Sequence, residues 1–171
     1  MNLYFMRHGI AVPRDAHEIH TDRERPLSPK GLKKMRRAAE GLLTLKLSFD
    51  RILTSPLLRA QQTAQVVAEV FNTEDRIEEI PELAPESSIQ KLLSSLAAYR
   101  ESKRLLFVGH QPLLGEIASF LLSGEKGLEM DFKKGGICCI EVDSLPPKKA
   151  LFRPYPHQPS VTGSANCASG R

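Results

Sequence analysis

The sequence predicts a single α/β domain: a mostly parallel central sheet with helices on both faces, forming a three-layer sandwich. Short apolar runs alternate with longer segments in which apolar residues recur at helical spacing. Serine followed by proline precedes two of the helical segments, as expected for an N-cap and a first helical position. The 171 residues can bury one substantial core, and no linker separates two domains.

The first elements are defined by clear boundaries. Residues 2–6 form a short apolar run, which predicts a central strand, and residues 10–25 are polar and loop-like. Ser28 and Pro29 then start an amphipathic helix that extends to about Lys46. Ser28 is therefore interpreted as a helix cap.

The middle of the chain repeats this order. Residues 50–54 predict a second strand, and Ser55 followed by Pro56 predicts a helix from Pro56 to about Phe71. Residues 77–80 predict a short strand before the proline-rich loop 81–85.

Four further elements close the domain. Ser87 or Ser88 is expected to cap a helix that runs to about Tyr99. Residues 105–108 predict a buried strand, followed by Gly-His-Gln-Pro and a helix to about Leu122. Residues 137–142 and 150–152 are expected to pair as antiparallel strands.

Composition changes after Arg153, where Pro, Ser, Gly and Ala dominate. We therefore expect one domain over residues 1–153 and a loosely held tail over residues 154–171. The three cysteines are Cys138, Cys139 and Cys167. Adjacent cysteines on a strand point to opposite faces, so we expect reduced, packed thiols and no disulfide framework.

Charge and hydropathy narrow the class of protein. The net charge is +4 and the basic residues are dispersed without interleaved aromatics, so we expect no nucleic-acid partner. Every apolar run is shorter than the roughly 20 residues that span a bilayer, and the opening MNLYFM is too short for a secretory signal. We expect a cytoplasmic protein without membrane contact. Its mild positive charge can attract an anionic substrate.

Three predicted strands end in groups suited to phosphate. They are Arg7-His8-Gly9, residues 54–56 leading to Arg59, and Gly109-His110. The carboxyl ends of parallel strands form the ligand crevice of such sheets, so these groups should converge. Two guanidinium forks can each hold two phosphate oxygens, Gly9 permits close backbone approach, and the helix N-termini add positive potential.

The same residues resemble a known family. Residues 5–9, FMRHG, resemble the Arg-His-Gly signature of the histidine phosphatase (phosphoglycerate mutase-like) superfamily. Residues 55–64 and Val108-Gly109-His110 resemble its second and third motifs, and residues 25–31 resemble its segment before the first helix. The resemblance covers about residues 1–153. The short chain and the loop 81–85 look most like SixA-type phosphohistidine phosphatases.

This resemblance implies a phosphoglycerate mutase-like fold and assigns roles to several residues. His8 would be the nucleophile, attacking in its neutral form to give a phospho-His8 intermediate, with the neighbouring arginines disfavouring the imidazolium. Arg7, Arg59 and His110 would hold the phosphoryl oxygens, and Glu82 matches the position of the family's proton donor. No metal and no cofactor are expected, because the arginines supply the positive charge.

Some residues keep two interpretations. Glu82 is a proton donor or a solvated loop carboxylate. Arg25 is a further substrate contact or an ion-pair partner of Asp22 or Glu24. Gln111 contacts substrate or hydrogen-bonds locally at a helix start. His17 and His20 have a His-x-x-His spacing, but without nearby cysteines we expect no metal there.

Three functions remain open at this stage. The first is hydrolysis of phosphohistidine on a phosphorelay or phosphotransfer protein. The second is hydrolysis of a small phosphate ester, such as a sugar phosphate or nucleotide. The third is a catalytically silent module that binds a phosphoprotein. The intact His8 and His110 argue against the third, because the arginines alone would suffice for binding.

Overall fold

The computed structural model describes residues 1–15, 19–124, 130–144 and 150–153. A six-stranded sheet has the order β3-β2-β4-β1-β5-β6. Its strands are β1 (Asn2–Arg7), β2 (Arg51–Thr54), β3 (Ile77–Glu79), β4 (Arg104–Gly109), β5 (Ile137–Val142) and β6 (Ala150–Arg153). The first four in sequence are mutually parallel, whereas β5 pairs antiparallel with β1 and β6 pairs antiparallel with β5. The expected mostly parallel sheet with an antiparallel closing pair is confirmed.

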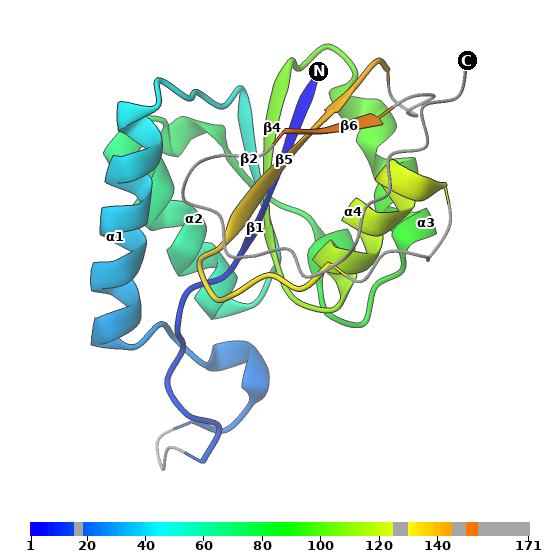
Figure 1. Cartoon of the computed structure of the whole chain (residues 1–171). Coiled ribbons are helices and arrows are strands. Elements are labelled where there is room, and N and C mark those ends of the chain that lie inside the picture. Colours follow the sequence, from blue (N-terminus) through cyan, green and yellow to red (C-terminus); the bar gives the residue numbers. More distant parts are fainter. Residues whose placement is uncertain (16–18, 125–129, 145–149, 154–171) are drawn as a thin grey trace.

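The helices cover both faces of the sheet. They are α1 (Pro29–Thr44), α2 (Leu58–Phe71), α3 (Ile89–Ser95) and α4 (Leu113–Ser123), with short 3₁₀ turns η1 (Asp22–Glu24), η2 (Glu74–Arg76), η3 (Pro81–Leu83) and η4 (Leu96–Tyr99). Figure 1 shows α1 and α2 on one side of the sheet and α3 and α4 on the other. The predicted three-layer α/β sandwich is therefore confirmed.

Each face of the sheet has its own hydrophobic core. Along β1, Leu3 and Phe5 pack with α3 and α4, whereas Tyr4 and Met6 pack with α1 and α2. This alternation follows from the two-residue period of a strand buried on both faces. The same alternation separates the cysteines: Cys138 lies in one core and the adjacent Cys139 in the other, and both are free thiols. Burial raises the pKa of the Cys138 thiol, which keeps it protonated.

Serine caps start two of the helices as expected. The Oγ of Ser28 accepts a hydrogen bond of 3.0 Å from the backbone N of Gly31 at the start of α1. Ser88 caps α3 in the same way through the backbone N of Lys91, at 3.3 Å. Regular α-helix ends at Ser95, however, and the remainder to Tyr99 is η4.

The expected cap at Ser55 is wrong. Helix α2 begins at Leu58, and its N-cap residue is Leu57. The Oγ of Ser55 does accept a hydrogen bond from the Leu57 backbone N at 3.3 Å, but it also lies beside a histidine from a distant strand. A serine–proline pair signals only local geometry, and here tertiary contacts determine how the serine is used.

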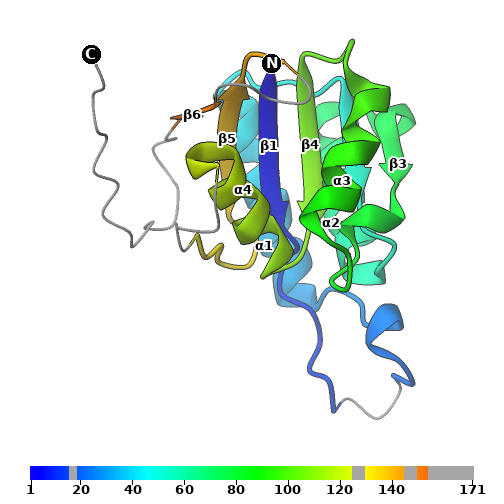
Figure 2. The ribbon, with the colours of Figure 1, turned by 90° about the vertical axis from the view of Figure 1, so that its right-hand side faces the viewer.

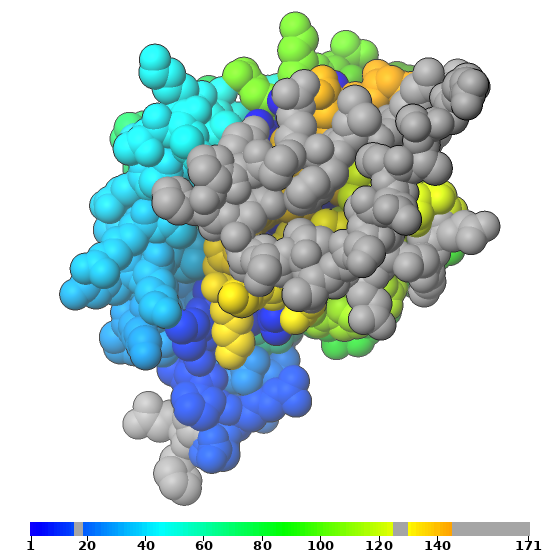
Figure 3. All heavy atoms as spheres, viewed as in Figure 1, coloured from blue at the N-terminus to red at the C-terminus, as the bar shows by residue number. Residues whose placement is uncertain are grey.

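The carboxyl ends of the parallel strands lie at one edge of the sheet, where β1 continues into the loop that precedes α1. Figure 2 shows this loop projecting beyond the rest of the domain. Figure 3 shows the N-terminal segment (dark blue) next to the segment before β5 (yellow) on the surface. The backbone joins them, because Gly135 N donates to the carbonyls of Arg7 and His8 at 3.0 and 3.2 Å.

Two expectations fall on residues outside this description: the loosely held tail 154–171 with Cys167, and His17. The domain boundary at Arg153 stays a prediction. None of the helices in the described part has the length and apolar character needed to cross a bilayer.

Candidate active site

The three strand-end motifs with groups suited to phosphate lie together at one edge of the sheet. The backbone N of His8 donates to the carbonyl of Gly109 at 3.0 Å, and that of Ser55 donates to the carbonyl of Val108 at 3.0 Å. These bonds continue the pairing of β1, β4 and β2 beyond the strand ends. The rings of His8 and His110 consequently lie with their centroids 5.0 Å apart.

His8 is held in one tautomer. Its Nδ1 lies 2.7 Å from the carbonyl oxygen of Gly9, which can only accept, so Nδ1 carries the proton. The Nε2 therefore has the lone pair, and it accepts a hydrogen bond of 3.3 Å from Nε of Arg59. Burial, followed by the charges of Arg59 and Arg7, lowers the pKa of His8 to about 4 against the opposing bond to Gly9. The ring is thus neutral at neutral pH, with burial as a larger cause than the arginine charges expected from the sequence.

His110 has the same tautomer as His8, but different groups contact its two ring nitrogens. Its Nε2 lies 2.8 Å from the Oγ of Ser55, which already accepts from the Leu57 backbone. We therefore assign the Ser55 hydroxyl as the donor and Nε2 of His110 as the acceptor, because the hydroxyl proton otherwise has no acceptor. This assignment places the ring proton on Nδ1, which is buried and has no hydrogen-bond partner in the described chain. Burial and then the neighbouring His8 lower the pKa of His110 to about 3.

Gly9 is tied to α2. Its backbone N donates to Oγ1 of Thr63 at 3.0 Å, and the Thr63 hydroxyl donates to the carbonyl of Arg59 at 2.7 Å. A Cβ at Gly9 would lie 2.6 Å from Cγ of Met35, so helix α1 packs too closely for a larger residue. Close packing against Met35 is thus one reason for a glycine at position 9. The other expected reason, close approach of an anion to the backbone, remains a prediction.

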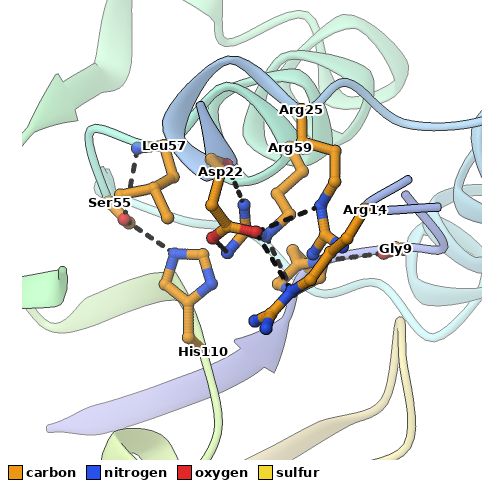
Figure 4. Close-up of polar contacts among 9 residues, drawn as sticks. Gly9, Arg14, Asp22, Arg25, Ser55, Leu57, Arg59 and His110 are labelled. Carbon is orange, nitrogen blue, oxygen red and sulfur yellow. Dashed lines mark hydrogen bonds and ion pairs between the residues drawn. The ribbon is translucent and has the colours of Figure 1, made fainter. Parts of the chain in front are cut away.

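Arg59 lies in the first turn of α2 and is buried. All three of its nitrogen positions are occupied: Nε donates to His8, Nη1 to the carbonyl of Asp22 at 2.7 Å, and Nη2 to Oδ2 of Asp22 at 2.9 Å. Figure 4 shows the Asp22 carboxylate among the arginine side chains and beside His110. The buried guanidinium is thus paired with both a histidine and a carboxylate.

Asp22 collects two more arginines. Its Oδ1 lies 3.3 Å from Nε of Arg25 and 3.4 Å from Nε of Arg14. Partial burial raises the pKa of Asp22, but the hydrogen bond from Arg59 and the charges of these arginines outweigh it and lower the pKa overall. Arg25 is therefore an ion-pair partner of Asp22, which is one of the two interpretations that the sequence left open. The contact between Asp22 and Arg59 and the presence of Arg14 were missed, since only the path of the loop brings them to α2.

Arg7 reaches the segment before β5. Its Nη1 donates to the carbonyl of Phe132 at 2.5 Å and lies 3.7 Å from Oδ1 of Asp131. Its Nε is buried and has no hydrogen-bond partner within the described residues. Among those residues, Arg7 Nε and His110 Nδ1 are therefore donors at the site that no protein acceptor uses.

Gln111 is committed to local contacts. Its Nε2 donates to the carbonyl of Met130 at 2.9 Å and to Oδ1 of Asp131 at 3.0 Å. Its Oε1 accepts from the backbone N of Gly115 at 2.9 Å. These contacts support the local alternative over direct substrate binding, and they fasten the segment that Arg7 also contacts.

Glu82 lies in η3, at the same edge of the sheet. The next residue, Leu83, packs on the end of β4, where a Cβ at Gly109 would be 3.5 Å from its Cδ2. Glu82 is half-buried and makes no hydrogen bond or ion pair with the part of the chain that the structure describes. Within the described residues its carboxylate is therefore uncommitted, while its role as a proton donor stays a prediction.

The described residues contain no cluster of side chains suited to binding a metal ion. Within the described ranges, no three His, Cys, Asp or Glu residues form a group that could hold an ion. His20 is exposed. The charge at the site comes from arginines.

Comparison with known proteins gives this geometry a family. A model of the histidine phosphatase superfamily (branch 1) matches residues 3–84. The phosphohistidine phosphatase SixA of Escherichia coli (strain K12) is 33% identical over 127 residues, covering 73% of this chain and 76% of that protein. The chain belongs to the histidine phosphatase superfamily. It is of the SixA type, as the sequence motifs indicated.

Further relatives and solved structures extend the similarity. An uncharacterized protein of Picosynechococcus sp. is 40% identical over 139 residues, covering 80% of this chain and 82% of that protein. The solved structure of the protein histidine phosphatase SixA complexed with tungstate has a TM-score of 0.78 and 30% identity, covering 90% of this chain and 94% of that one. An alpha-ribazole phosphatase from Shigella flexneri, with a TM-score of 0.68 and 20% identity over 90% of this chain and 95% of that one, shares the fold.

Proposed function

We propose that this protein is a phosphohistidine phosphatase that works through a phosphorylated His8. The observation that carries the proposal is the tautomer of His8, whose Nδ1–H is held by the carbonyl of Gly9 and whose lone pair is therefore on Nε2. A neutral imidazole with one fixed lone pair is a suitable nucleophile for phosphorus. The SixA relatives, named for action on phosphohistidine, support the same substrate class.

The reaction has two balanced steps. In the first, Nε2 of His8 attacks phosphorus in line and the bond from phosphorus to the leaving nitrogen breaks. The leaving ring, already protonated on its other nitrogen, keeps the bonding pair and departs as neutral imidazole. In the second, water attacks the phosphorus of phospho-His8 and the bond from phosphorus to Nε2 breaks. The oxygen and protons of the water leave with inorganic phosphate and solvent, and Nε2 regains its lone pair. For attack to occur, the hydrogen bond from Arg59 Nε to His8 Nε2 must first open.

Charge in the transition state would be stabilised by donors already at the site. Arg7 Nε and His110 Nδ1 are buried donors without protein acceptors, so each can bind a phosphoryl oxygen without losing an existing bond. Arg59 can add its guanidinium once it leaves His8. The arginine charges would then serve the purpose that a metal ion serves in other phosphoryl-transfer enzymes.

A small phosphate ester is the second candidate substrate. The uncommitted carboxylate of Glu82 favours it, because an alkoxide leaving group needs a proton from a general acid. An imidazole leaving group, with a reference pKa of about 6.5, needs less help. Comparing both substrate classes on one preparation separates the two candidates.

The test is a trapping experiment. The protein is incubated with phosphohistidine-bearing protein and with a panel of sugar phosphates and nucleotides, with and without EDTA. We expect turnover of phosphohistidine in EDTA and an acid-labile, base-stable phosphoryl group on His8 by mass spectrometry. His8→Asn should lose both, whereas His110→Asn should slow turnover while the label still maps to His8. Turnover by His8→Asn, or strict dependence on a divalent ion, would contradict the proposal.

A further inference from the structure

Three arginines, Arg14, Arg25 and Arg59, surround a carboxylate of the protein itself, that of Asp22. The carboxylate of Asp22 lies 2.9 Å from Arg59, 3.3 Å from Arg25 and 3.4 Å from Arg14. Guanidinium forks bind carboxylate and phosphate through the same donors. Asp22 therefore occupies donors that a phosphoryl group needs.

The Asp22 carboxylate also faces His110. Figure 4 shows it between His110 and the arginine side chains. Its charge acts on His110, where it favours the protonated ring against the stronger effects of burial, His8 and Arg59. Asp22 and an incoming dianion bound by the same arginines would repel each other.

We propose that Asp22 is an internal competitor for the oxyanion site, occupying Arg59 and Arg25 when no phosphoryl group is bound and returning as phosphate leaves. The proposal rests on the proposed function only in that the site accepts a phosphoryl group. Its consequence is weak binding of free phosphate and rapid product release. Without this carboxylate, the clustered positive charge would retain the dianionic product.

The surroundings of Asp22 give it room to withdraw. It lies in the 3₁₀ turn η1, which contains no buried residue, and its side chain is 42% exposed. A hollow of about 340 Å³ adjoins it, lined by Arg14, Ile19, His20, Thr21, Asp22 and Arg25. The carboxylate can therefore move toward solvent without disrupting a hydrophobic core.

A purely structural role predicts the opposite result. If Asp22 only orients Arg59, its removal weakens oxyanion binding, because the guanidinium loses its alignment. Asp22→Asn separates the two cases. It keeps the size of the side chain and the backbone carbonyl that accepts from Arg59 Nη1 at 2.7 Å, and it removes the charge together with one acceptor oxygen.

The matched control is Asp131→Asn. Asp131 is also a carboxylate beside an active-site arginine, 3.7 Å from Arg7, but its side chain is 85% exposed. Removing it subtracts the same formal charge from the same edge of the sheet. The control therefore measures the general electrostatic effect of one lost negative charge, which screening by water keeps small.

The experiment is calorimetric titration of the full chain with tungstate and with inorganic phosphate, together with product inhibition by phosphate. We expect Asp22→Asn to lower Kd and the inhibition constant by roughly two- to fivefold, the range for a partly exposed charge pair. The value of kcat should fall together with KM, because product leaves more slowly. Asp22→Ala, checked with Asp22→Asn for an unchanged thermal transition, should tighten binding as well.

Either of two outcomes overturns the inference: weaker or unchanged oxyanion binding in both Asp22 variants, or an equal tightening in Asp131→Asn. Failure of the wild-type protein and of both Asp22 variants to bind either oxyanion would instead refute the proposed phosphoryl site itself. The two failures are thus distinguishable from one set of titrations.

Discussion

The Oγ of Ser55 lies 2.8 Å from Nε2 of His110, although 55 positions separate them in the chain. Ser55 is completely buried, and its hydroxyl links the histidine to the backbone at the start of α2. Through this contact a residue with no proposed chemical step determines which nitrogen of His110 carries the proton. Ser55 is in this sense a positioning residue.

Ser55→Ala should therefore impair turnover without preventing folding. The change leaves Nε2 of His110 and the backbone N of Leu57 without their hydrogen-bond partner, and a buried unsatisfied group costs about 1–3 kcal/mol. We expect kcat/KM to fall by roughly tenfold or more. The ¹⁵N shifts of the His110 ring should show a mixture of tautomers. Unchanged shifts with an unchanged rate would refute the assignment, and Ser94→Ala, an exposed serine, provides the control.

Stability should decline as the pH falls from about 6.5 toward 3. The pKa values of His8 and His110 are lowered to about 4 and about 3, so over this window the unfolded histidines bind protons that the folded ones do not. More protons on the unfolded state means that stability rises with pH, by up to about 1.4 kcal/mol per pH unit for each histidine.

Urea unfolding at several pH values measures this slope. The contribution of carboxylates cancels when the wild-type protein is compared with the double variant His8→Asn/His110→Asn. The variant should show the shallower pH dependence. Parallel curves for the two proteins would mean that the histidines are not held neutral in the folded state.

Two glycines of α1 should respond oppositely to alanine. A Cβ at Gly31 would lie 2.0 Å from the carbonyl oxygen of Ile10, a backbone atom, so Gly31→Ala must displace the loop. We expect a loss of about 1–3 kcal/mol. A Cβ at Gly41 meets nothing within 4 Å, and Gly41→Ala should stabilise by about 0.5–1 kcal/mol. Thermal and urea unfolding of both variants test the pair, and effects of equal sign would contradict the packing described.

Glu82→Gln should distinguish the two substrate classes. Loss of a needed general acid typically slows a reaction by roughly 10²- to 10⁴-fold. We expect a loss of that size on an alkyl phosphate ester but only a modest loss on phosphohistidine, because the leaving imidazole can carry its own proton. Single-turnover rates are required, since product release can mask the chemical step. Equal large losses on both substrates would show that Glu82 has another role.

The elements of the fold could be predicted from the sequence because each depends on neighbouring residues. The pattern around Met35 and Leu42 specifies an amphipathic helix, and the serine at position 28 specifies where it starts. The convergence of His8 and His110 followed from one topological rule about strand ends. Asp22 could not be placed on Arg59 in this way, because that contact depends on the path of a loop, which no periodic pattern encodes.

The backbone N of His8 donates to the carbonyl of Gly109, so the two histidines follow adjacent positions on neighbouring strands. Their separation is set by the spacing of paired strands, about 4.8 Å, and not by any loop or helix. The segments before α1 and before β5 surround the two histidines and contact each other, but they do not set this spacing. Changes in the length or sequence of those segments therefore leave the spacing of the two histidines unaltered.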